Sequence, residues 1–493
     1  MVKAAAFFDT ILLINHRNHK IMENYNKRRI AHWDNVADKL RSWKGLGKYY
    51  NSRISQIYQF NIPEGHSVLE VGTGTGKLLA TLNPKNGLGI DLSEKMITLA
   101  KEIHPELDFQ QMDAIDLDIK KKFDFVVVSD TINDLWDVQA TFENISKVMH
   151  ADGRLVLNFY NRIWELPLKI AEKMNLAKPN LDQNWLTVDD AKNLLDLAGF
   201  EVVRSWEEVL IPFAIPLITS FFNKFLVRLW PFKHFAMTHF LVARLKSKTA
   251  YRKKDPFVSI IVPTRNESGN IKSIFKRIPK EFSKFEYIFI EGHSTDDTVE
   301  EIKRQIELHP EVNASFYQQE GKGKGDAVRL GFSKSKGDIL MILDADLTMP
   351  PENLPRFYDG LVSGVGDFIN GVRLVYPMEK DAMRFFNFLG NKFFSVVFTF
   401  FLGQPVKDTL CGTKVLWKKD YEEIAANRDY FGDFDPFGDF DLLFGAAKLN
   451  LKIVDMPIRY TERVYGQTNI QRWKHGWLLL QMVVFAANRL KFI

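Results

Sequence analysis

The chain has 493 residues, enough for two to four domains at roughly 100–200 residues each. Hydrophobic residues make up 46% and charged residues 26%, which excludes a wholly disordered chain and a fibrous one. The net charge of +5 is too small to indicate a nucleic-acid-binding protein, although it suits an anionic substrate or an anionic membrane surface. The single cysteine, Cys411, excludes an internal disulfide and a cysteine-ligated zinc site.

The start of the chain is a poor signal peptide. Its apolar stretch, residues 4–14, is interrupted by Asp9 and precedes no small-residue cleavage site, so we expect a cytoplasmic protein. No uncharged stretch reaches the ~20 residues that span a bilayer. Three stretches come partway, at residues 209–222, 393–406 and 475–487. Each is either a buried helix or a helix at a membrane surface, which leaves open a position at the inner face of the cytoplasmic membrane.

A short basic segment divides the chain. We predict domains over residues 1–245 and 256–493, joined by an exposed basic linker at 246–255. Each half alternates strand-like apolar runs with helical patterns, which is typical of parallel α/β sheets. The expected strands are 67–71, 87–90, 123–129 and 154–159 in the first half, and 257–262, 286–290 and 338–343 in the second. Ligands of such sheets bind at the carboxyl ends of the strands.

A glycine-rich turn follows the first expected strand. Glu70 ends that strand, and Gly72, Gly74 and Gly76 lead into a helical pattern. Glycine allows a ligand close to the backbone and permits positive φ, while the helix that follows presents free N–H groups. The spacing differs from the Gly-x-Gly-x-x-Gly of dinucleotide-binding folds. Asp91 ends the next strand about 20 residues on, where it could accept hydrogen bonds from ribose hydroxyls.

These residues resemble class I S-adenosylmethionine-dependent methyltransferases, over residues 25–245. The resemblance implies a Rossmann-like fold that binds S-adenosylmethionine through Glu70 and the three glycines, with Asp91 at the ribose. It also implies that Asp113 lies beside the adenine and that Asp130, after the fourth strand, faces the methyl donor. One alternative is a nucleotide-binding fold that has lost its ligand.

The methyl-acceptor side is less defined. The turn after the fourth strand contains Asp130, Asp134, Trp136 and Asp137. These residues either line the acceptor pocket or form a solvated acidic turn with one packed tryptophan. An apolar, helical-looking insert at 211–231 precedes the last strand. It either roofs the acceptor pocket, lies on a membrane with Lys224 and Arg228 at the headgroups, or packs against the other half.

Two carboxylates end a buried strand of the second half. Asp344 and Asp346 follow the apolar run 339–343, and residues i and i+2 of a strand project to one face, where they can hold a hard cation. Such a cation neutralises a diphosphate leaving group, as sugar transfer from a nucleotide sugar requires. An Asp-x-Asp triplet alone is usually a solvated turn, so the neighbouring segments 258–267, 291–298 and 321–327 decide its interpretation.

Together these segments resemble family 2 glycosyltransferases of the GT-A fold, over residues 255–475, and most closely the dolichyl-phosphate mannosyltransferase-like branch. The resemblance implies a GDP- or UDP-linked sugar donor, with Mg or Mn bound by Asp344 and Asp346. The residues it places at the donor are Pro263, Arg265, Glu267 and Glu291 at the nucleotide, and Lys322, Lys324 and Arg463 at the phosphates. The family often has paired aspartates at residues 291–292, so Glu291 and Gly292, followed by His293, leave the nucleobase open.

The acceptor side also follows from the resemblance. In the carrier-lipid branch, arginines that match Arg373 and Arg384 hold the acceptor's phosphate, which a guanidinium can bind bidentately. Arg384 begins a phenylalanine-rich helical stretch, 385–401, that would meet the membrane; the alternative is a core helix with two surface arginines. If the acceptor is a hydroxyl instead, Asp439 or Asp441 could act as general base.

The whole order, including residues 408–414, resembles bacterial fusions of these two families. We therefore predict an α/β protein of two doubly wound domains: a methyltransferase, then an inverting, metal-dependent glycosyltransferase that acts on polyprenyl phosphate or a glycan. Its expected catalytic residues are Asp344, Asp346, Asp439 and Asp441. The alternatives are a first domain that binds S-adenosylmethionine without turnover, and a non-enzymatic peripheral membrane adaptor.

Overall fold

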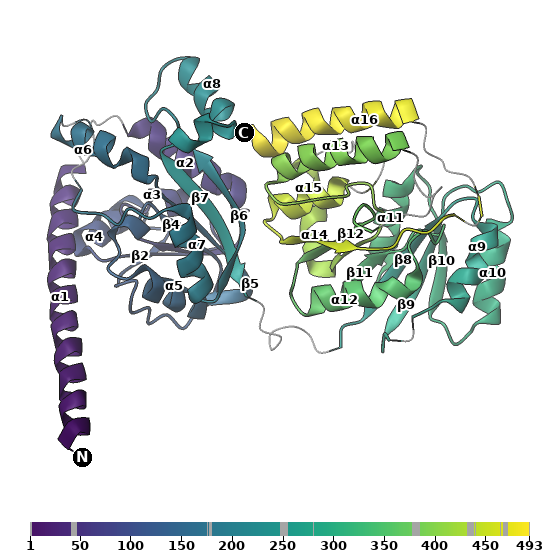
Figure 1. Ribbon diagram of the computed structural model, residues 1–493, viewed down its shortest axis with the longest axis horizontal. Helices are drawn as coiled ribbons and strands as arrows, with labels where there is room; N and C mark the ends of the chain where they lie inside the picture. Colours follow the sequence, from purple (N-terminus) through teal and green to yellow (C-terminus); the bar gives the residue numbers. More distant parts are fainter. Residues whose placement is uncertain are drawn as a thin grey trace. The chain divides into compact units, whose positions relative to one another are not determined.

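The chain forms two compact units, Met1–Lys246 and Ser247–Ile493. A computed structural model describes residues 2–40, 47–174, 176, 180–246, 255–279, 281–376, 385–430, 438, 440–463, 465–466 and 472–492. Most of the expected linker therefore lies outside the described residues. Each unit contains one seven-stranded mixed sheet with helices on both faces, so the expectation of two doubly wound α/β folds is confirmed (Figure 1).

The sheet of the first unit has the order β3-β2-β1-β4-β5-β7-β6. Its strands are β1 Ser67–Val71, β2 Asn86–Asp91, β3 Asp108–Gln111, β4 Phe123–Ser129, β5 Met149–Tyr160, β6 Phe200–Glu208 and β7 Thr238–Leu245. All neighbours pair in parallel except β7, which runs antiparallel to both β5 and β6. The four strands expected in this half are present, and the insert lies between the last two strands as predicted.

Alternate residues of these strands feed two hydrophobic cores. Val126 and Val128 face a core that α5 (Val138–Lys147) and α7 (Val188–Leu197) cover. Phe125 and Val127 face the opposite core, which α2 (Lys48–Asn61), α3 (Lys77–Thr81) and α4 (Glu94–Ile103) cover. This period of two is what a sheet buried on both faces requires.

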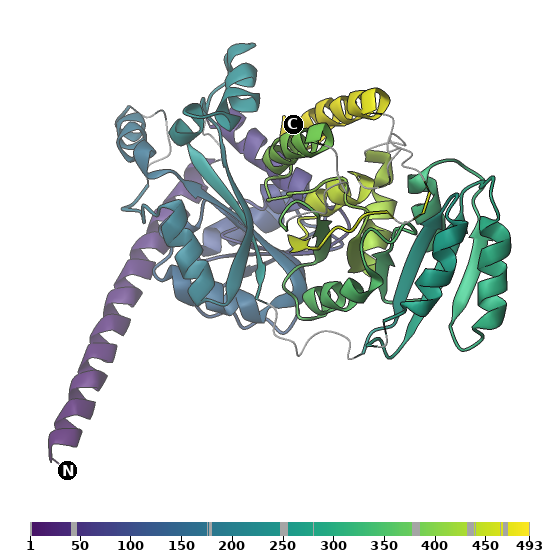
Figure 2. The same ribbon diagram turned by 45° about the vertical axis from the view of Figure 1, so that its right-hand side comes forward.

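Helix α1 (Val2–Leu40) lies outside these layers (Figure 2). Its last turns pack on α4 through Val36, Ala37 and Met96. The remaining helices of the unit are α6 (Glu165–Lys173) and α8 (Ile218–Lys224), with the short helices η1 (Ile132–Asp134), η2 (Arg162–Trp164), η3 (Leu226–Arg228) and η4 (Phe232–Phe235). The insert is therefore helical only in short pieces, because prolines 212, 216 and 231 interrupt it.

The sheet of the second unit has the order β10-β9-β8-β11-β13-β12-β14. Its strands are β8 Val258–Thr264, β9 Phe285–Glu291, β10 Ala314–Gln318, β11 Ile339–Ile342, β12 Phe368–Val372, β13 Lys414–Trp417 and β14 Ile453–Pro457. Only β13 runs antiparallel to its neighbours among these pairs. The three expected strands are again present, shifted by one or two residues at their ends.

Helices cover both faces of this sheet as well. On one face lie α9 (Ser268–Lys276), α10 (Thr298–Leu308) and α12 (Leu354–Val362), which share a core with Ile260 and Val262. On the other face α11 (Lys324–Lys334) packs so closely on β8 that a Cβ at Gly331 would lie 2.5 Å from Ile261. The elements that follow are η6 (Pro351–Asn353), α13 (Phe385–Leu402), α14 (Lys418–Ala426), η7 (Arg428–Tyr430), α15 (Phe440–Lys448), α16 (Arg472–Ala486) and η8 (Ala487–Lys491).

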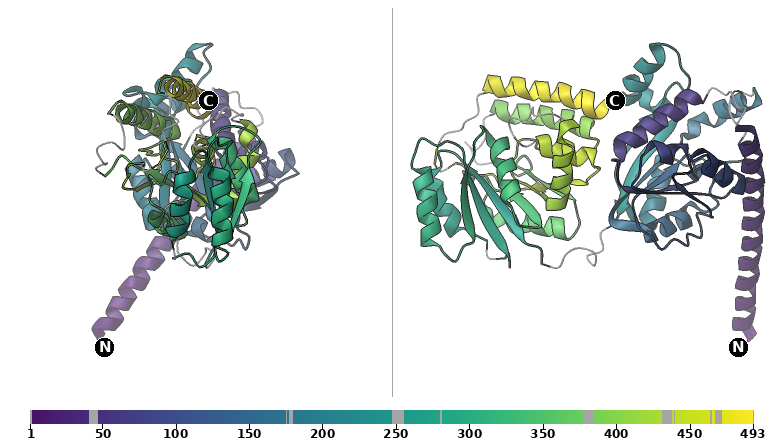
Figure 3. Two further views of the ribbon diagram at one scale, coloured as in Figure 1. Left: turned by 90° about the vertical axis from the view of Figure 1, so that its right-hand side faces the viewer. Right: turned by 180° about the vertical axis from the view of Figure 1, so that it is seen from behind.

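The phenylalanine-rich stretch forms α13, as expected, and lies beside α16 (Figure 3). Phe398 is fully buried against Phe440 and Phe444 of α15. Phe393 and Val396 on the same helix are exposed. This helix is thus partly core and partly surface. Within the described part of the chain, no helix is long and apolar enough to cross a membrane.

Candidate active sites

The glycine-rich turn of the first unit lies between the carboxyl ends of β2 and β4, because Val71 pairs with Ile90 on one side and Val128 on the other. Gly72, Gly74 and Gly76 have φ of 74°, 52° and 72°, a region that favours glycine. A Cβ at Gly72 would lie 2.3 Å from Thr131 Oγ1, whereas at Gly74 it would meet no atom within 4 Å. The backbone at Gly74 therefore borders open space, where a ligand can approach.

Two buried carboxylates hold this turn. Glu70 Oε2 accepts hydrogen bonds from Thr73 Oγ1 (2.7 Å) and from the Leu79 backbone N–H (3.2 Å). Asp91 Oδ2 accepts from the Gly74 N–H at 2.9 Å. Burial raises the pKa of Glu70 to about 8, and it also raises the pKa of Asp91 above its ordinary value. Glu70 thus shapes the loop from beneath, while Asp91 ties the loop to the end of β2.

Helix α1 reaches the same edge of the sheet, which the sequence interpretation missed. Asn26 Nδ2 donates to Asp113 Oδ2 at 2.6 Å, and Trp33 Nε1 donates to Asp134 Oδ2 at 3.0 Å. Arg29 forms an ion pair with Asp134 at 3.5 Å. The sequence does carry a signal for a helix face that contacts the domain. Tyr25, Arg29 and Trp33 are spaced four apart, and residues with that spacing lie on one face of a helix.

A second polar cluster surrounds Asp130, which follows β4 with φ of 52°. The Tyr50 hydroxyl lies 2.9 and 3.0 Å from its two carboxylate oxygens, and Asn158 Nδ2 donates to Oδ1 at 2.5 Å. Burial, followed by the charge of Asp130, raises the pKa of Tyr50 well above its ordinary value, so Tyr50 stays protonated and donates. The Tyr160 ring lies 6.0 Å from the Tyr50 ring.

The acidic turn after β4 divides between two roles. Asp134 lies under α1, as described above. Asp137 instead caps α5 by accepting a hydrogen bond from the Ala140 N–H at 2.9 Å. Trp136 is exposed, and its ring centroid lies 5.2 Å from that of Tyr25. Asp137 is therefore a helix cap, whereas Asp134 is held by Trp33 and Arg29 of α1.

In the second unit, the two aspartates after β11 each contact a basic side chain. Lys324 Nζ lies 2.6 Å from Asp344 Oδ1, and Arg463 Nη2 donates to Asp346 Oδ2 at 2.6 Å. Burial would raise the pKa of Asp344, but the adjacent Lys324 outweighs it and the pKa lies below the ordinary value. A Cβ at Gly412 would lie 2.1 Å from both Asp344 Oδ2 and Lys324 Nζ, so the segment 408–414 needs glycine here.

Two carboxylates fit one Mg or Mn ion whose remaining ligands come from substrate phosphates and water. Among the described residues, no group of three or more His, Cys, Asp and Glu side chains could enclose an ion without such help. The two carboxylates, each already balanced by a cation, fit an ion that arrives together with a diphosphate.

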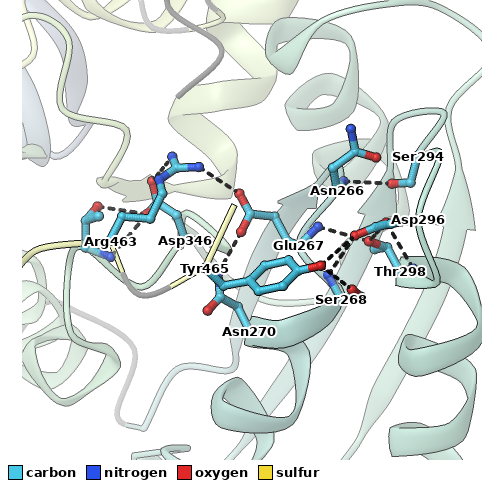
Figure 4. A network of polar contacts seen from close by, with 11 residues as sticks. Asn266, Glu267, Ser268, Asn270, Ser294, Asp296, Thr298, Asp346, Arg463 and Tyr465 are labelled. Atoms are coloured by element: carbon cyan, nitrogen blue, oxygen red, sulfur yellow. Dashed lines mark hydrogen bonds and ion pairs between the residues drawn. The ribbon is translucent and has the colours of Figure 1, made fainter. Parts of the chain in front are cut away.

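Arg463 joins this pair to the nucleotide side of the site (Figure 4). Its Nη1 donates to Glu267 Oε1 at 3.2 Å, and Asn270 Nδ2 donates to Glu267 Oε2 at 2.6 Å. Burial raises the pKa of Glu267 to about 7, although Arg463 opposes the shift. Arg463 thus bridges Asp346 and Glu267, two residues that the sequence placed at the metal and at the nucleotide.

Tyr465, two residues further along, was not singled out from the sequence. Its hydroxyl lies 2.9 Å from Ser268 Oγ and 3.5 Å from Asp296 Oδ2 (Figure 4). The ring lies flat over Gly269, where a Cβ would come within 2.4 Å of Tyr465 Cδ2. Residues 463 and 465 therefore lie across the start of α9.

The other expected donor residues are spread around this centre. Glu291 is buried at the end of β9 and accepts hydrogen bonds from the Ser294 N–H and from Gln318 Nε2 (3.0 Å). His293, with φ of 60°, lies 3.0 Å from the Gly321 carbonyl oxygen through Nε2 and so contacts the lysine-bearing loop. Three further donor residues are at least partly exposed, namely Pro263, Arg265 and Lys322.

The expected acceptor and base residues are already paired. Arg373 donates bidentately to the buried Asp408, with Nε to Oδ2 at 2.7 Å and Nη2 to Oδ1 at 2.8 Å. Asp441, on α15, forms an ion pair with Arg428 at 3.0 Å. Arg384 and Asp439 lie outside the described residues.

Comparison with family models assigns both units. Residues 62–199 match a model described as a methyltransferase domain, and residues 259–425 match glycosyl transferase family 2. The chain carries a methyltransferase domain followed by a family 2 glycosyltransferase domain. Both are domains of enzymes, and their order is the one expected from the sequence.

Individual relatives resemble the glycosyltransferase domain. A dolichol-phosphate mannosyltransferase of Pyrococcus furiosus is 28% identical over 43% of this chain and 59% of its own length. A low-salt glycan biosynthesis hexosyltransferase of Haloferax volcanii, Agl6, is 26% identical over 45% of this chain and 52% of its own. The chain thus spans little more than half the length of these curated relatives.

A TehB-like methyltransferase structure from Corynebacterium glutamicum is 20% identical to this chain. The match covers 44% of this chain and 99% of that structure's chain, with a TM-score of 0.30.

Proposed function

We propose that the second unit transfers a sugar from a GDP- or UDP-linked donor to a lipid phosphate or a glycan, with Mg or Mn held by Asp344 and Asp346. The observation that carries the proposal is the convergence of these carboxylates with Lys324 and Arg463 at the end of β11. The metal, when bound, neutralises the departing diphosphate. Lys324 and Arg463 add positive charge in positions fixed before the reaction.

The acceptor is better supported as a phosphate than as a hydroxyl. A phosphate oxygen needs no strong general base, whereas a hydroxyl does, and the described candidate base, Asp441, is engaged by Arg428. The names of the relatives, a dolichol-phosphate mannosyltransferase and a glycan hexosyltransferase, agree with acceptors of this kind. Arg373, held in place by Asp408, would present its remaining N–H groups to that phosphate.

The test is sugar transfer from radiolabelled GDP- and UDP-sugars to polyprenyl phosphate, with and without Mn. We expect one donor to react only when metal is present, and Asp346→Asn to abolish transfer while leaving the thermal unfolding midpoint in place. Asp359→Asn, on the exposed face of α12, is the matched control. Full activity of the Asp346 variant, or activity in a chelator, would disprove the metal assignment.

For the first unit we propose methyl transfer from S-adenosylmethionine, with Asp91 at the ribose, Asp113 at the adenine and the open side of Gly74 against the cofactor. The cofactor, when bound, supplies a methyl group on a sulfonium. Asp130, fixed by Tyr50 and Asn158, would then either take a proton from a hydroxyl acceptor or stabilise the positive charge that moves onto an amine. Asp130→Asn should leave cofactor binding intact and remove turnover.

We propose domain limits of 1–245 and 256–493. We also propose that the protein acts in the cytoplasm, at the inner face of the cytoplasmic membrane. The alternative, a cofactor-binding scaffold without turnover, predicts calorimetric binding of S-adenosylmethionine and no transfer of a labelled methyl group to a lipid or glycan extract. Transfer to any such acceptor would exclude the scaffold. Methyl transfer only to acceptors unrelated to sugars or lipids would show that the two domains do not act on the same class of molecule.

A further inference from the structure

The insert between β6 and β7 buries several polar side chains and exposes many of its large apolar ones. Asn223 is buried and accepts hydrogen bonds from the Leu210 and Ile211 N–H groups at 2.7 and 2.9 Å. Arg228 forms an ion pair with Glu208, and both side chains are buried. The expectation that Arg228 lies at lipid headgroups is therefore wrong, because this residue anchors the insert to the sheet.

The outer side of the insert is strongly apolar. Leu217 is 88% exposed and Trp230 is 77% exposed, whereas large apolar side chains normally bury most of their surface. Four phenylalanines share this exposed side, namely Phe221, Phe225, Phe232 and Phe235. Exposed large apolar side chains that gather in one insert mark an interaction site.

Helix α6 extends this surface. None of its residues is buried, and its apolar residues Leu166 and Ile170, with Met174 just beyond its end, lie on one exposed stripe at i, i+4 and i+8. The residue before the helix, Trp164, donates through Nε1 to the Phe235 carbonyl oxygen at 2.9 Å. The helix and the insert are thus joined, and both lie on the upper side of the unit in Figures 1 and 3. We call α6 and residues 210–235 the apolar surface.

The charges of the insert identify a partner. No aspartate or glutamate occurs between Glu208 and Asp255. Within the insert, Lys224 and His234 are exposed and Lys233 is half-exposed, so basic groups border the apolar side chains. Apolar and tryptophan side chains that enter the acyl boundary, with lysines at the anionic headgroups, are the features of a protein surface that lies on a membrane.

We propose that the apolar surface of the methyltransferase domain binds a bilayer that contains anionic lipids. This goes beyond the proposed sugar transfer and does not rest on it. The surface adjoins the carboxyl edge of the sheet. Asn161, directly after β5, donates at 2.9 Å to the carbonyl oxygen of Ala236, where the insert leads into β7. Docking here brings the end of β5, with Tyr160, toward the membrane.

A fluorescent probe at one position tests the proposal without interference from the other domain. The only cysteine, Cys411, is buried, so Leu217→Cys can be labelled selectively with an environment-sensitive dye in the full chain. We expect its emission to shift to the blue with phosphatidylglycerol-containing vesicles, and less with pure phosphatidylcholine or at high salt. Leu197→Cys, a 66% exposed site on α7, is the matched control and should not respond.

Two results would overturn the proposal. Emission at residue 217 that stays unchanged while the chain sediments with vesicles would show binding through another surface. Emission that is already shifted to the blue in the absence of vesicles would show that protein covers the surface, either the second unit or another copy of the chain. As an independent measurement, Phe221→Ser with Trp230→Ser should weaken vesicle binding roughly tenfold or more, and Leu197→Ser should not. Sugar transfer to a soluble short-chain acceptor should be unchanged by either, which separates this proposal from the glycosyltransferase assignment.

Discussion

Arg463 donates a 2.6 Å hydrogen bond to Asp346, one of the two carboxylates proposed to bind the metal. If Asp346 binds the metal as proposed, the ion and the Arg463 guanidinium would compete for this carboxylate. Because Arg463 also contacts Glu267, its release from Asp346 would free two carboxylates together. The family resemblance implies that Arg463 contacts the donor phosphates, so a metal held by Asp346 would leave this arginine available to the diphosphate.

This exchange predicts opposite effects on binding and on turnover. Arg463→Ala should tighten Mn binding to the donor-free protein, because a competing cation is lost, and should slow sugar transfer by roughly a hundredfold, because a donor of charge-assisted hydrogen bonds to the phosphates is lost. Titration of Mn by electron paramagnetic resonance and the transfer assay measure the two effects. Arg356→Ala, an exposed arginine of α12, is the control. Weaker Mn binding in the Arg463 variant would contradict the exchange.

The contact between Tyr465 and Gly269 predicts that the position of the tyrosine ring depends on the glycine. Gly269→Ala would place a Cβ 2.4 Å from the Tyr465 ring, so the ring must move away. We expect the KM for the nucleotide sugar to rise about tenfold, and more than in Tyr465→Phe, which loses only the contacts of the hydroxyl. In a Tyr465→Ala background, Gly269→Ala should have little further effect. Additive effects in this double-mutant cycle would show that the glycine acts independently of the ring.

Asp408 holds Arg373, the residue proposed to contact the acceptor phosphate. Removal of one partner from a buried ion pair costs about 3–5 kcal/mol, so Asp408→Asn should lower the unfolding free energy by that order. Arg373→Met in the same chain should recover most of the loss, because no unpaired charge remains. The double variant should nevertheless bind polyprenyl phosphate poorly, with an elevated KM for the acceptor and an unchanged KM for the donor. An unchanged acceptor KM would remove Arg373 from the acceptor site.

The strands that could be predicted from the sequence are those with continuous apolar runs, such as 67–71 and 257–262, because parallel strands are buried on both faces. The edge strands β3 and β10 were missed, since β3 has one buried residue and β10 has none. Motifs also located the two sites, through residues close together in the chain. Their partners could not be found in that way: Arg463 meets Asp346 across 117 positions, and Asn26 meets Asp113 across 87.

The glycine-turn carboxylate Glu70 predicts a pH-dependent stability. Burial raises its pKa from 4.5 to about 8, so the folded first unit binds a proton that the unfolded chain releases. The stabilisation is fully present below pH 4.5 and is lost as the pH rises through about 8, at about 1.4 kcal/mol for each pKa unit. Glu70→Gln keeps an acceptor for Thr73 and Leu79 and cannot ionise, so it mimics the protonated state.

We therefore expect the wild-type chain to lose thermal stability between about pH 4.5 and pH 8 in the unfolding transition of the first unit, while the Glu70→Gln variant changes little over that range. The two proteins should be alike below about pH 4.5, and the variant should unfold at the higher temperature at pH 9. Glu64→Gln, an exposed carboxylate before β1, should follow the wild type throughout. A variant that is less stable than the wild type at pH 9 would show that Glu70 is ionised in the fold, and that the turn depends on its charge and not only on its hydrogen bonds.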